Sequence, residues 1–130
     1  MLERLYEAQA WESLVAATFE HAKRFSLEGC ESLIPLLNAL VDVSARLGVR
    51  RAFMAMPHRG RLNVLVNVMG VAASAVLARL DPSTDAAREL RDLPYHLGGR
   101  VVRDTPYTHR CGPDFRADAS TGGGPVARPR

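Results

Sequence analysis

The sequence predicts an α/β protein: a partial domain that is mostly helical with one or two strands, followed by a disordered C-terminal tail. Apolar residues recur at helical spacing through most of the first 80 residues. Residues 49–56 form a short apolar run between Gly48 and Pro57, which indicates a buried strand. Such a strand needs neighbours to satisfy its N–H and C=O groups. We therefore favour a piece of a larger α/β domain over an all-helical protein.

Two helices are expected before this strand, over residues 2–20 and roughly 31–47. The apolar stripe of the first consists of Leu2, Tyr6, Ala10, Leu14 and Ala17, widened by Leu5. The apolar face of the second consists of Leu33, Ile34, Leu37, Leu40 and Val41, closed by Leu47. Pro35 is tolerated in a first helical turn, where its missing N–H has no partner to lose. Gly48 is a suitable C-terminal stop.

Two more helices are expected after the strand. Residues 59–69 place four apolar side chains on one inward face: Leu62, Leu65, Val66 and Met69. Residues 71–80 form the next helix, which Asp81 and Pro82 stop. The order is thus helix, helix, strand, helix, helix. Further on, at most "RVVR" at 100–103 is expected to pair as a short second strand.

A domain boundary is predicted after residue 98. Residues 1–98 carry the helical and strand-like patterns, whereas residues 99–130 have the composition of a low-complexity or disordered tail. Five of the ten Gly and four of the eight Pro follow Gly98. Beyond that residue, Tyr107 and Phe115 are the only large apolar side chains in a polar and Gly/Pro-rich context.

Composition and charge limit the classes of function. The net charge is +3, and the 17 basic residues include a single Lys, Lys23. This modest charge, without a zinc-ligand spacing or a dense basic run, argues against nucleic-acid binding. There is no apolar run of about 18 residues to cross a membrane and no secretory signal at the N-terminus. With only Cys30 and Cys111, a reduced cytoplasmic chain is expected.

The most informative segment is "MPHRGRLNVL", residues 56–65. It places His58, Arg59, Gly60 and Arg61 where the expected strand ends and a helix begins. Ligands of open α/β sheets bind at such a place, where helix N–H groups are unpaired. Two guanidinium groups and an imidazole suit an anion, either a phosphate or a carboxylate. The structural alternative is a pair of solvated Arg side chains and a histidine that serves only packing.

Weaker candidates flank this cluster. Asn63 and Asn67 share one helix face as ligand contacts or, preferably, as solvated positions. Glu28 and Glu31 surround a glycine and could act as general acid or base, although helix-start carboxylates are the better interpretation. His96 lies in "YHLG", residues 95–98, which is a weak motif when considered alone.

Three segments carry a resemblance to a known family: "KRFSLEGCESLIPLL" (23–37), "MPHRGRLNVLVNV" (56–68) and "YHLG" (95–98). In residue identity, order and spacing they resemble the start of the catalytic region of 2-oxoglutarate dehydrogenase, the thiamine-diphosphate-dependent first component of its complex. The actinobacterial form, a multifunctional 2-oxoglutarate decarboxylase, is most similar in residue identity. The resemblance covers roughly residues 10–98. A relative that acts on 2-oxoadipate shares much of the central block, so both substrates stay open.

The resemblance implies a partial thiamine-diphosphate-binding domain of an oxidoreductase in the tricarboxylic acid cycle. Such an enzyme decarboxylates its 2-oxo acid substrate and passes a succinyl unit to a lipoyl group. His58 and His96 match the family's catalytic and substrate-binding histidines, and Arg59 and Arg61 match its motif as further substrate-binding candidates. Thiamine diphosphate and magnesium are the implied cofactors. A homodimer and the lipoyl succinyltransferase component are the implied partners.

The departures from the family are also informative. "RDLP" at 91–94 stands where the family usually has Gly-Asp-Val-Lys. The Asn-Pro-Ser-His-Leu-Glu segment, the Gly-Asp-Gly…Asn segment for magnesium and diphosphate, and the distant activating Glu have no counterpart in the sequence. We therefore expect a fragment or truncated paralogue that is inactive alone. The alternative function is a non-catalytic helical module that binds a partner.

Overall fold

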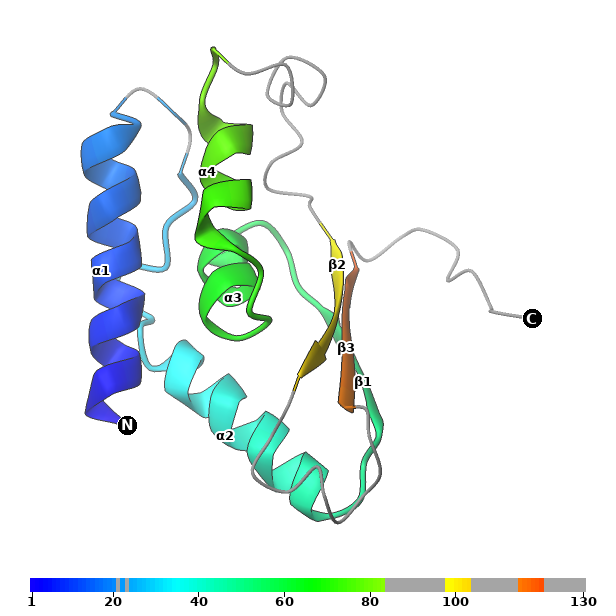
Figure 1. Ribbon diagram of the computed structural model, residues 1–130. Helices are drawn as coiled ribbons and strands as arrows, with labels where there is room; N and C mark the ends of the chain where they lie inside the picture. The colour runs from blue at the N-terminus through cyan, green and yellow to red at the C-terminus, as the bar shows by residue number, and fades with distance from the viewer. Residues whose placement is uncertain (21, 23, 84–97, 104–114, 121–130) are drawn as a thin grey trace.

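The computed structural model describes residues 1–20, 22, 24–83, 98–103 and 115–120. Its elements are α1 (Leu2–Thr18), α2 (Leu33–Arg46), β1 (Arg51–Ala55), α3 (Arg61–Asn67), α4 (Ala73–Leu80), β2 (Gly99–Arg103) and β3 (Phe115–Ser120). The helices lie to one side of a three-stranded sheet, and α3 lies between α1 and the strands (Figure 1). This is the mostly helical α/β arrangement that the sequence predicts.

The sheet has the strand order β1-β3-β2. β1 runs parallel to β3 with Arg51 opposite Arg116, and β2 runs antiparallel to β3 with Gly99 opposite Ala119. The sequence predicts one or two strands, and the structure has three. β3 escapes prediction because the apolar positions of "FRADAS" hold one large residue, Phe115, and two alanines, so its alternation is a weak signal. The rest of the predicted tail lies outside the described residues, and the domain boundary at residue 98 stays a prediction.

β1 is covered on one face only, so the prediction of a fully buried strand is wrong. Ala52 and Met54 are half-buried toward the helices, whereas Arg51, Phe53 and Ala55 are exposed on the other face. Phe53 leaves 68% of its surface exposed. The physical reason is that the described helices all lie on one side of the sheet.

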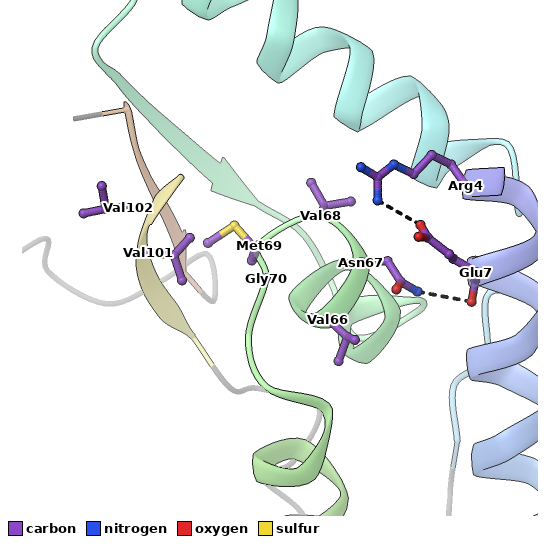
Figure 2. A pocket seen from close by; sticks show the side chains of 9 residues that line it. All are labelled: Arg4, Glu7, Val66, Asn67, Val68, Met69, Gly70, Val101 and Val102. Atoms are coloured by element: carbon purple, nitrogen blue, oxygen red, sulfur yellow. Dashed lines mark hydrogen bonds and ion pairs between the residues drawn. The ribbon is translucent and has the colours of Figure 1, made fainter. Parts of the chain in front are cut away.

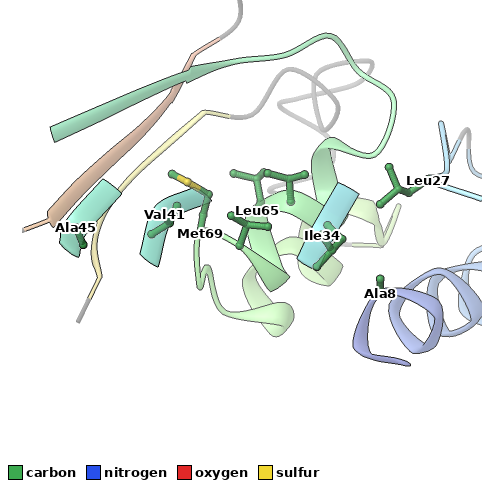
Figure 3. Packing of buried hydrophobic residues seen from close by; sticks show 9 residues of the cluster. Ala8, Leu27, Ile34, Val41, Ala45, Leu65 and Met69 are labelled. Carbon is green, nitrogen blue, oxygen red and sulfur yellow. The ribbon is translucent and has the colours of Figure 1, made fainter. Parts of the chain in front are cut away.

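Two apolar clusters hold the helices together, and α3 contributes to both. The larger one lies between α2, α3 and the sheet (Figure 3) and contains Ala8, Leu27, Ile34, Val41, Ala45, Val64, Leu65, Val68 and Met69. The smaller one joins α1, α3 and α4 through Trp11, Val15, Leu62, Val76 and Leu80. Burial of such side chains stabilises by about 1.5–3 kcal/mol each. The helix next to the candidate site is thus anchored on several sides.

The predicted helices are present, with ends within a few residues of the expected ones, but the buried face of α1 differs from the prediction. The predicted stripe is exposed along its whole length, from Leu2 to Ala17. The buried residues are Ala8, Trp11, Glu12 and Val15. This face includes the carboxyl group of Glu12, so a search for an apolar stripe does not find it. In α2, Leu40 and Leu47 were likewise expected inside and are 58% and 76% exposed.

A polar contact explains why α1 turns this face inward. Asn63 of α3 is 1% exposed, and its Nδ2 donates to Glu12 Oε1 at 2.8 Å and to the carbonyl oxygen of Ala8 at 3.0 Å. Asn67 Nδ2 donates to Asn63 Oδ1 at 2.7 Å and to the carbonyl oxygen of Glu7 at 3.4 Å. The preferred interpretation of solvated Asn side chains is therefore wrong for Asn63, which joins two helices.

We expect Asn63→Leu to destabilise the fold by about 2–4 kcal/mol, because it removes the donor that the buried Glu12 carboxyl and the Ala8 carbonyl share. Urea unfolding followed by circular dichroism measures the change. Gln9→Leu, an exposed change on the same helix, should stay within about 0.5 kcal/mol.

The double variant Glu12→Leu/Asn63→Leu should cost less than the sum of its two single variants, because neither the Glu12 carboxyl nor the Asn63 amide is then left buried without the other. A strictly additive cycle would contradict the proposed joint between α1 and α3.

Candidate functional site

The predicted anion-receiving turn lies where the sequence places it, between the end of β1 and the start of α3. The Arg61 N–H donates to the His58 carbonyl at 3.1 Å, and the Val64 N–H donates to the Gly60 carbonyl at 3.0 Å. Gly60 is the residue before α3 and has a φ of 70°. Only glycine adopts this left-handed conformation without appreciable cost. The turn therefore requires glycine at this position.

A second segment, residues 24–27, packs directly on this turn. The Gly60 N–H donates to the carbonyl oxygen of Phe25 at 2.8 Å. Leu27 is 2% exposed and fills the space beside Gly60 so closely that a Cβ at position 60 would collide with its Cδ1 atom. We name residues 24–27 and 57–61 together the loop–turn clamp. It joins two of the segments that carry the family resemblance.

Two side chains of the turn also reach the loop. Arg59 Nη1 donates to the carbonyl oxygen of Ser26 at 3.0 Å. The rings of His58 and Phe25 lie with their centroids 4.2 Å apart and their planes inclined by 51°. The side chains of His58 and Phe25 both remain exposed. The His58 imidazole therefore packs against an aromatic ring and is also open to solvent. The clamp thus presents one ionisable ring on a fixed support.

Phe25 is a residue that sequence reasoning missed. Its φ is 37°, the one positive value outside glycine among the described residues. A non-glycine residue in this region costs on the order of 1–3 kcal/mol, which the surrounding structure must offset. Here its carbonyl accepts the Gly60 N–H and its ring contacts His58. No periodicity or motif chemistry marks it; its only sequence signal is its place in "KRFSLEG".

Arg61 lies inside the protein and not on its surface. Its side chain is 1% exposed, and Nη2 donates to the carbonyl oxygen of Met56, just beyond the end of β1. Burial lowers the pKa of the guanidinium from its ordinary value. Because arginine stays protonated in proteins, the charge remains. Arg61 therefore links the end of the strand to the start of α3.

His96 and the rest of "YHL" lie outside the described residues. The structure therefore does not say whether His96 approaches His58, and the pairing of the two histidines stays a prediction. The roles assigned to Arg59 and Arg61 in substrate binding likewise stay predictions.

The acidic candidates near the clamp differ from each other. Glu31 Oε1 accepts the Gly29 N–H at 2.9 Å in the turn before α2. Hydrogen bonds from the backbone N–H of Glu31 itself and of Gly29 lower the pKa of this carboxyl. A carboxylate held in its charged form suits the helix-start interpretation better than a general acid. Glu28 is exposed.

A pocket of about 580 Å³ lies away from the clamp, between α1, α3 and β2 (Figure 2). Arg4 and Glu7, paired at 2.9 Å, form its polar side, and Val66 to Gly70 with Val101 and Val102 form the rest. Of the described candidates, Asn67 lines this pocket, and His58, Arg59 and Arg61 do not. Among the described residues, no group of three or more His, Cys, Asp or Glu is placed to hold a metal ion. Nor does any helix in that part of the chain have the length and apolar character to cross a bilayer.

Comparison with known proteins finds relatives whose names agree with one another. The chain is 42% identical over 111 residues to a "2-oxoglutarate dehydrogenase-like, mitochondrial" protein of Rattus norvegicus, which covers 85% of this chain and 11% of the relative. It is 40% identical over 103 residues to "2-oxoglutarate dehydrogenase, mitochondrial" of Caenorhabditis briggsae, covering 79% and 10%. The chain thus spans about a tenth of the length of the curated relatives it matches. No family model matches it.

We expect Gly60→Ala to destabilise the fold by about 2–4 kcal/mol, because the new methyl group adds a collision with buried Leu27 to the cost of a positive φ. Gly48→Ala is the matched control: its φ is 88° and no atom lies within 4 Å of the added Cβ. It should cost only about 1 kcal/mol. Urea unfolding measures both, and equal losses would contradict the close approach at Gly60.

Proposed function

Since its matched segment belongs to the 2-oxoglutarate dehydrogenase family, we propose that this chain carries the His58 side of a 2-oxo acid site. The activity to which it contributes is the oxidative decarboxylation of 2-oxoglutarate. In that reaction a succinyl group passes to a lipoyl group, in the tricarboxylic acid cycle. The lipoyl succinyltransferase component and a homodimeric assembly are the partners that the family implies. The substrate, the partners and a cytoplasmic location are all parts of this proposal; the relatives themselves are named mitochondrial.

The observation that carries the proposal is the loop–turn clamp. Two motif segments, more than 30 positions apart, meet through a main-chain hydrogen bond, an arginine–carbonyl contact and a ring contact. Strain at Phe25 is tolerated in this same contact. Strained backbone that the surroundings hold in place is concentrated at functional sites. An exposed imidazole on such a support is well suited to receive a ligand.

His58 would bind the negative end of the 2-oxo acid. Its ring N–H donates to a substrate carboxylate or to the developing charge of an adduct. Phe25 restricts the ring to one orientation, so little side-chain freedom is lost on binding. Arg59 and Arg61 order the turn, through Ser26 and Met56, and help to hold a cationic environment next to the substrate.

The family's segment for magnesium and diphosphate has no counterpart in the sequence, so the role that we propose for this chain leaves the cofactor to other parts of the enzyme. Thiamine diphosphate supplies the electron sink that permits loss of carbon dioxide from a 2-oxo acid. Magnesium bound with it prefers oxygen ligands. The described residues contain no carboxylate-rich group that fits this ion. The contribution that we propose for this chain concerns the substrate.

The isolated chain should not release carbon dioxide from 2-oxoglutarate, even with thiamine diphosphate and magnesium, because the residues that would anchor the metal are missing from its motifs. A radiometric assay with carboxyl-labelled substrate measures this, with a full-length relative as the positive control. Release above the no-protein blank would overturn the expectation.

In a full-length relative, alanine at the position matching His58 or His96 should lower kcat/KM for 2-oxoglutarate about 10- to 150-fold. This is the loss of one charge-assisted hydrogen bond of about 1.5–3 kcal/mol. The melting temperature should stay nearly unchanged. Methionine at the position matching Arg61 should instead lower the melting temperature, because that side chain is buried.

If the histidine variants unfold the enzyme while the folded remainder keeps normal kinetics, the residues are structural and the proposal fails. Running the same assays with 2-oxoadipate distinguishes the two candidate substrates.

A further inference from the structure

The pocket between α1, α3 and β2 is polar at one end and apolar at the other (Figure 2). Arg4 and Glu7 line it from α1, whereas Met69, just after α3, and Val101 of β2 line the opposite end. Its volume of about 580 Å³ lies within the range of small-molecule sites, roughly 300–1,000 Å³. The role proposed for the loop–turn clamp leaves this pocket unused. It therefore offers room and a mixed lining for a separate small ligand.

The ion pair at the polar end uses only part of its bonding capacity. Arg4 Nη1 donates to Glu7 Oε2 at 2.9 Å, and among the described contacts this is the one hydrogen bond of either side chain. The remaining guanidinium N–H groups and Glu7 Oε1 are therefore available to a ligand. The two side chains are 43% and 35% exposed. Because so exposed a pair adds little stability, it can rearrange around a ligand at small cost.

The opposite charges of this pair select the head group of the ligand. A lone carboxylate would be attracted by Arg4 and repelled by the adjacent Glu7, and a lone ammonium would meet the reverse. A head that carries both charges side by side satisfies both residues. Asn67 adds an acceptor, because its Nδ2 already donates to Asn63 Oδ1 and to the Glu7 carbonyl, which leaves Asn67 Oδ1 for a donor. The polar end thus suits a zwitterion whose ammonium lies toward Glu7 and Asn67.

The apolar end selects the rest of the ligand. Val66 and Val101 are half-buried, so part of their surface is still open to a ligand. Beneath them Val68 and Met69 are each 3% exposed and belong to the core, which gives this end a firm apolar floor. An aliphatic side chain placed here would leave water together with the valine surface that it covers. A head without such a side chain would not gain this contribution.

We propose that this pocket binds a free α-amino acid with an aliphatic side chain, such as leucine. Its carboxylate contacts Arg4, its ammonium contacts Glu7 and Asn67 Oδ1, and its side chain lies toward Val66 and Val101. The site is separate from the proposed 2-oxo acid site and does not rest on it. For a ligand this small, a dissociation constant on the order of 1 mM is expected.

Amide NMR spectra of the isotope-labelled full chain, recorded during a titration with L-leucine, test the proposal. Signals of residues that line the pocket, including Glu7, Asn67 and Gly70, should shift and saturate. Isocaproate, which lacks the ammonium, isoamylamine, which lacks the carboxylate, and glycine, which lacks the side chain, should each bind at least tenfold more weakly. The absence of a saturable shift with L-leucine overturns the proposal, and so does equal binding of isocaproate or isoamylamine.

Two substitutions separate the contacts of the head group. Arg4→Met should weaken the binding of L-leucine at least tenfold without weakening that of isoamylamine, and Glu7→Gln should do the same without weakening that of isocaproate. Arg46→Met is the matched control, because Arg46 is an exposed arginine at the end of α2 and does not line the pocket. An equal loss in the control and in Arg4→Met would contradict the site. Circular dichroism checks that each variant is folded; if one is not, the ligand series on the unaltered chain decides the question.

Discussion

The close approach of two backbones at Gly60 is the constraint on which the rest of the site depends. The carbonyl of Phe25 accepts the Gly60 N–H, and Leu27 occupies the space that a side chain at position 60 would need. Leu27 also belongs to the core shared by α2, α3 and the sheet. Packing of the core therefore fixes the loop, the loop fixes the turn, and the turn fixes His58. The position of the imidazole is a consequence of tertiary packing and not of a local turn preference.

Helix α3 illustrates how polar groups can support such an arrangement from inside. With seven residues it is too short to be stable in isolation. It persists because Arg61 reaches back to the carbonyl at Met56, Asn63 joins α1, and its apolar residues enter two clusters. The residues that most resemble ligand contacts in the sequence use most of their side-chain donors in these internal hydrogen bonds. Within the clamp, the side chain of His58 remains exposed, and the contact described for it is the one with the Phe25 ring.

The sequence predicted the helices well because 3.6-residue periodicity and Gly or Pro stops are local signals. It placed the strand-to-helix turn correctly for the same reason. It failed on the buried face of α1, where a carboxylate is accommodated by Asn63 from another helix. It failed on β3, whose alternating pattern is weak because two of its three apolar residues are alanine. It failed also on Phe25, whose role arises from a contact across more than 30 positions. Information of that kind lies in the pairing of distant segments, which a single sequence does not display.

The order of strands in the sheet bears on how the chain can fold. Among the described elements β1 has no partner near it in sequence; it pairs with β3, and α3, α4 and β2 lie between the two strands in the chain. Closing so long a loop before any pairing contact forms is entropically costly and slows parallel sheets in particular. During synthesis the helices can form and pack first. The backbone N–H and C=O groups of β1 that pair with β3 have no partner until residues 115–120 have emerged. Throughout that interval β1 is an unpaired strand with Phe53 facing water, the kind of segment that chaperones bind and that aggregates when they do not.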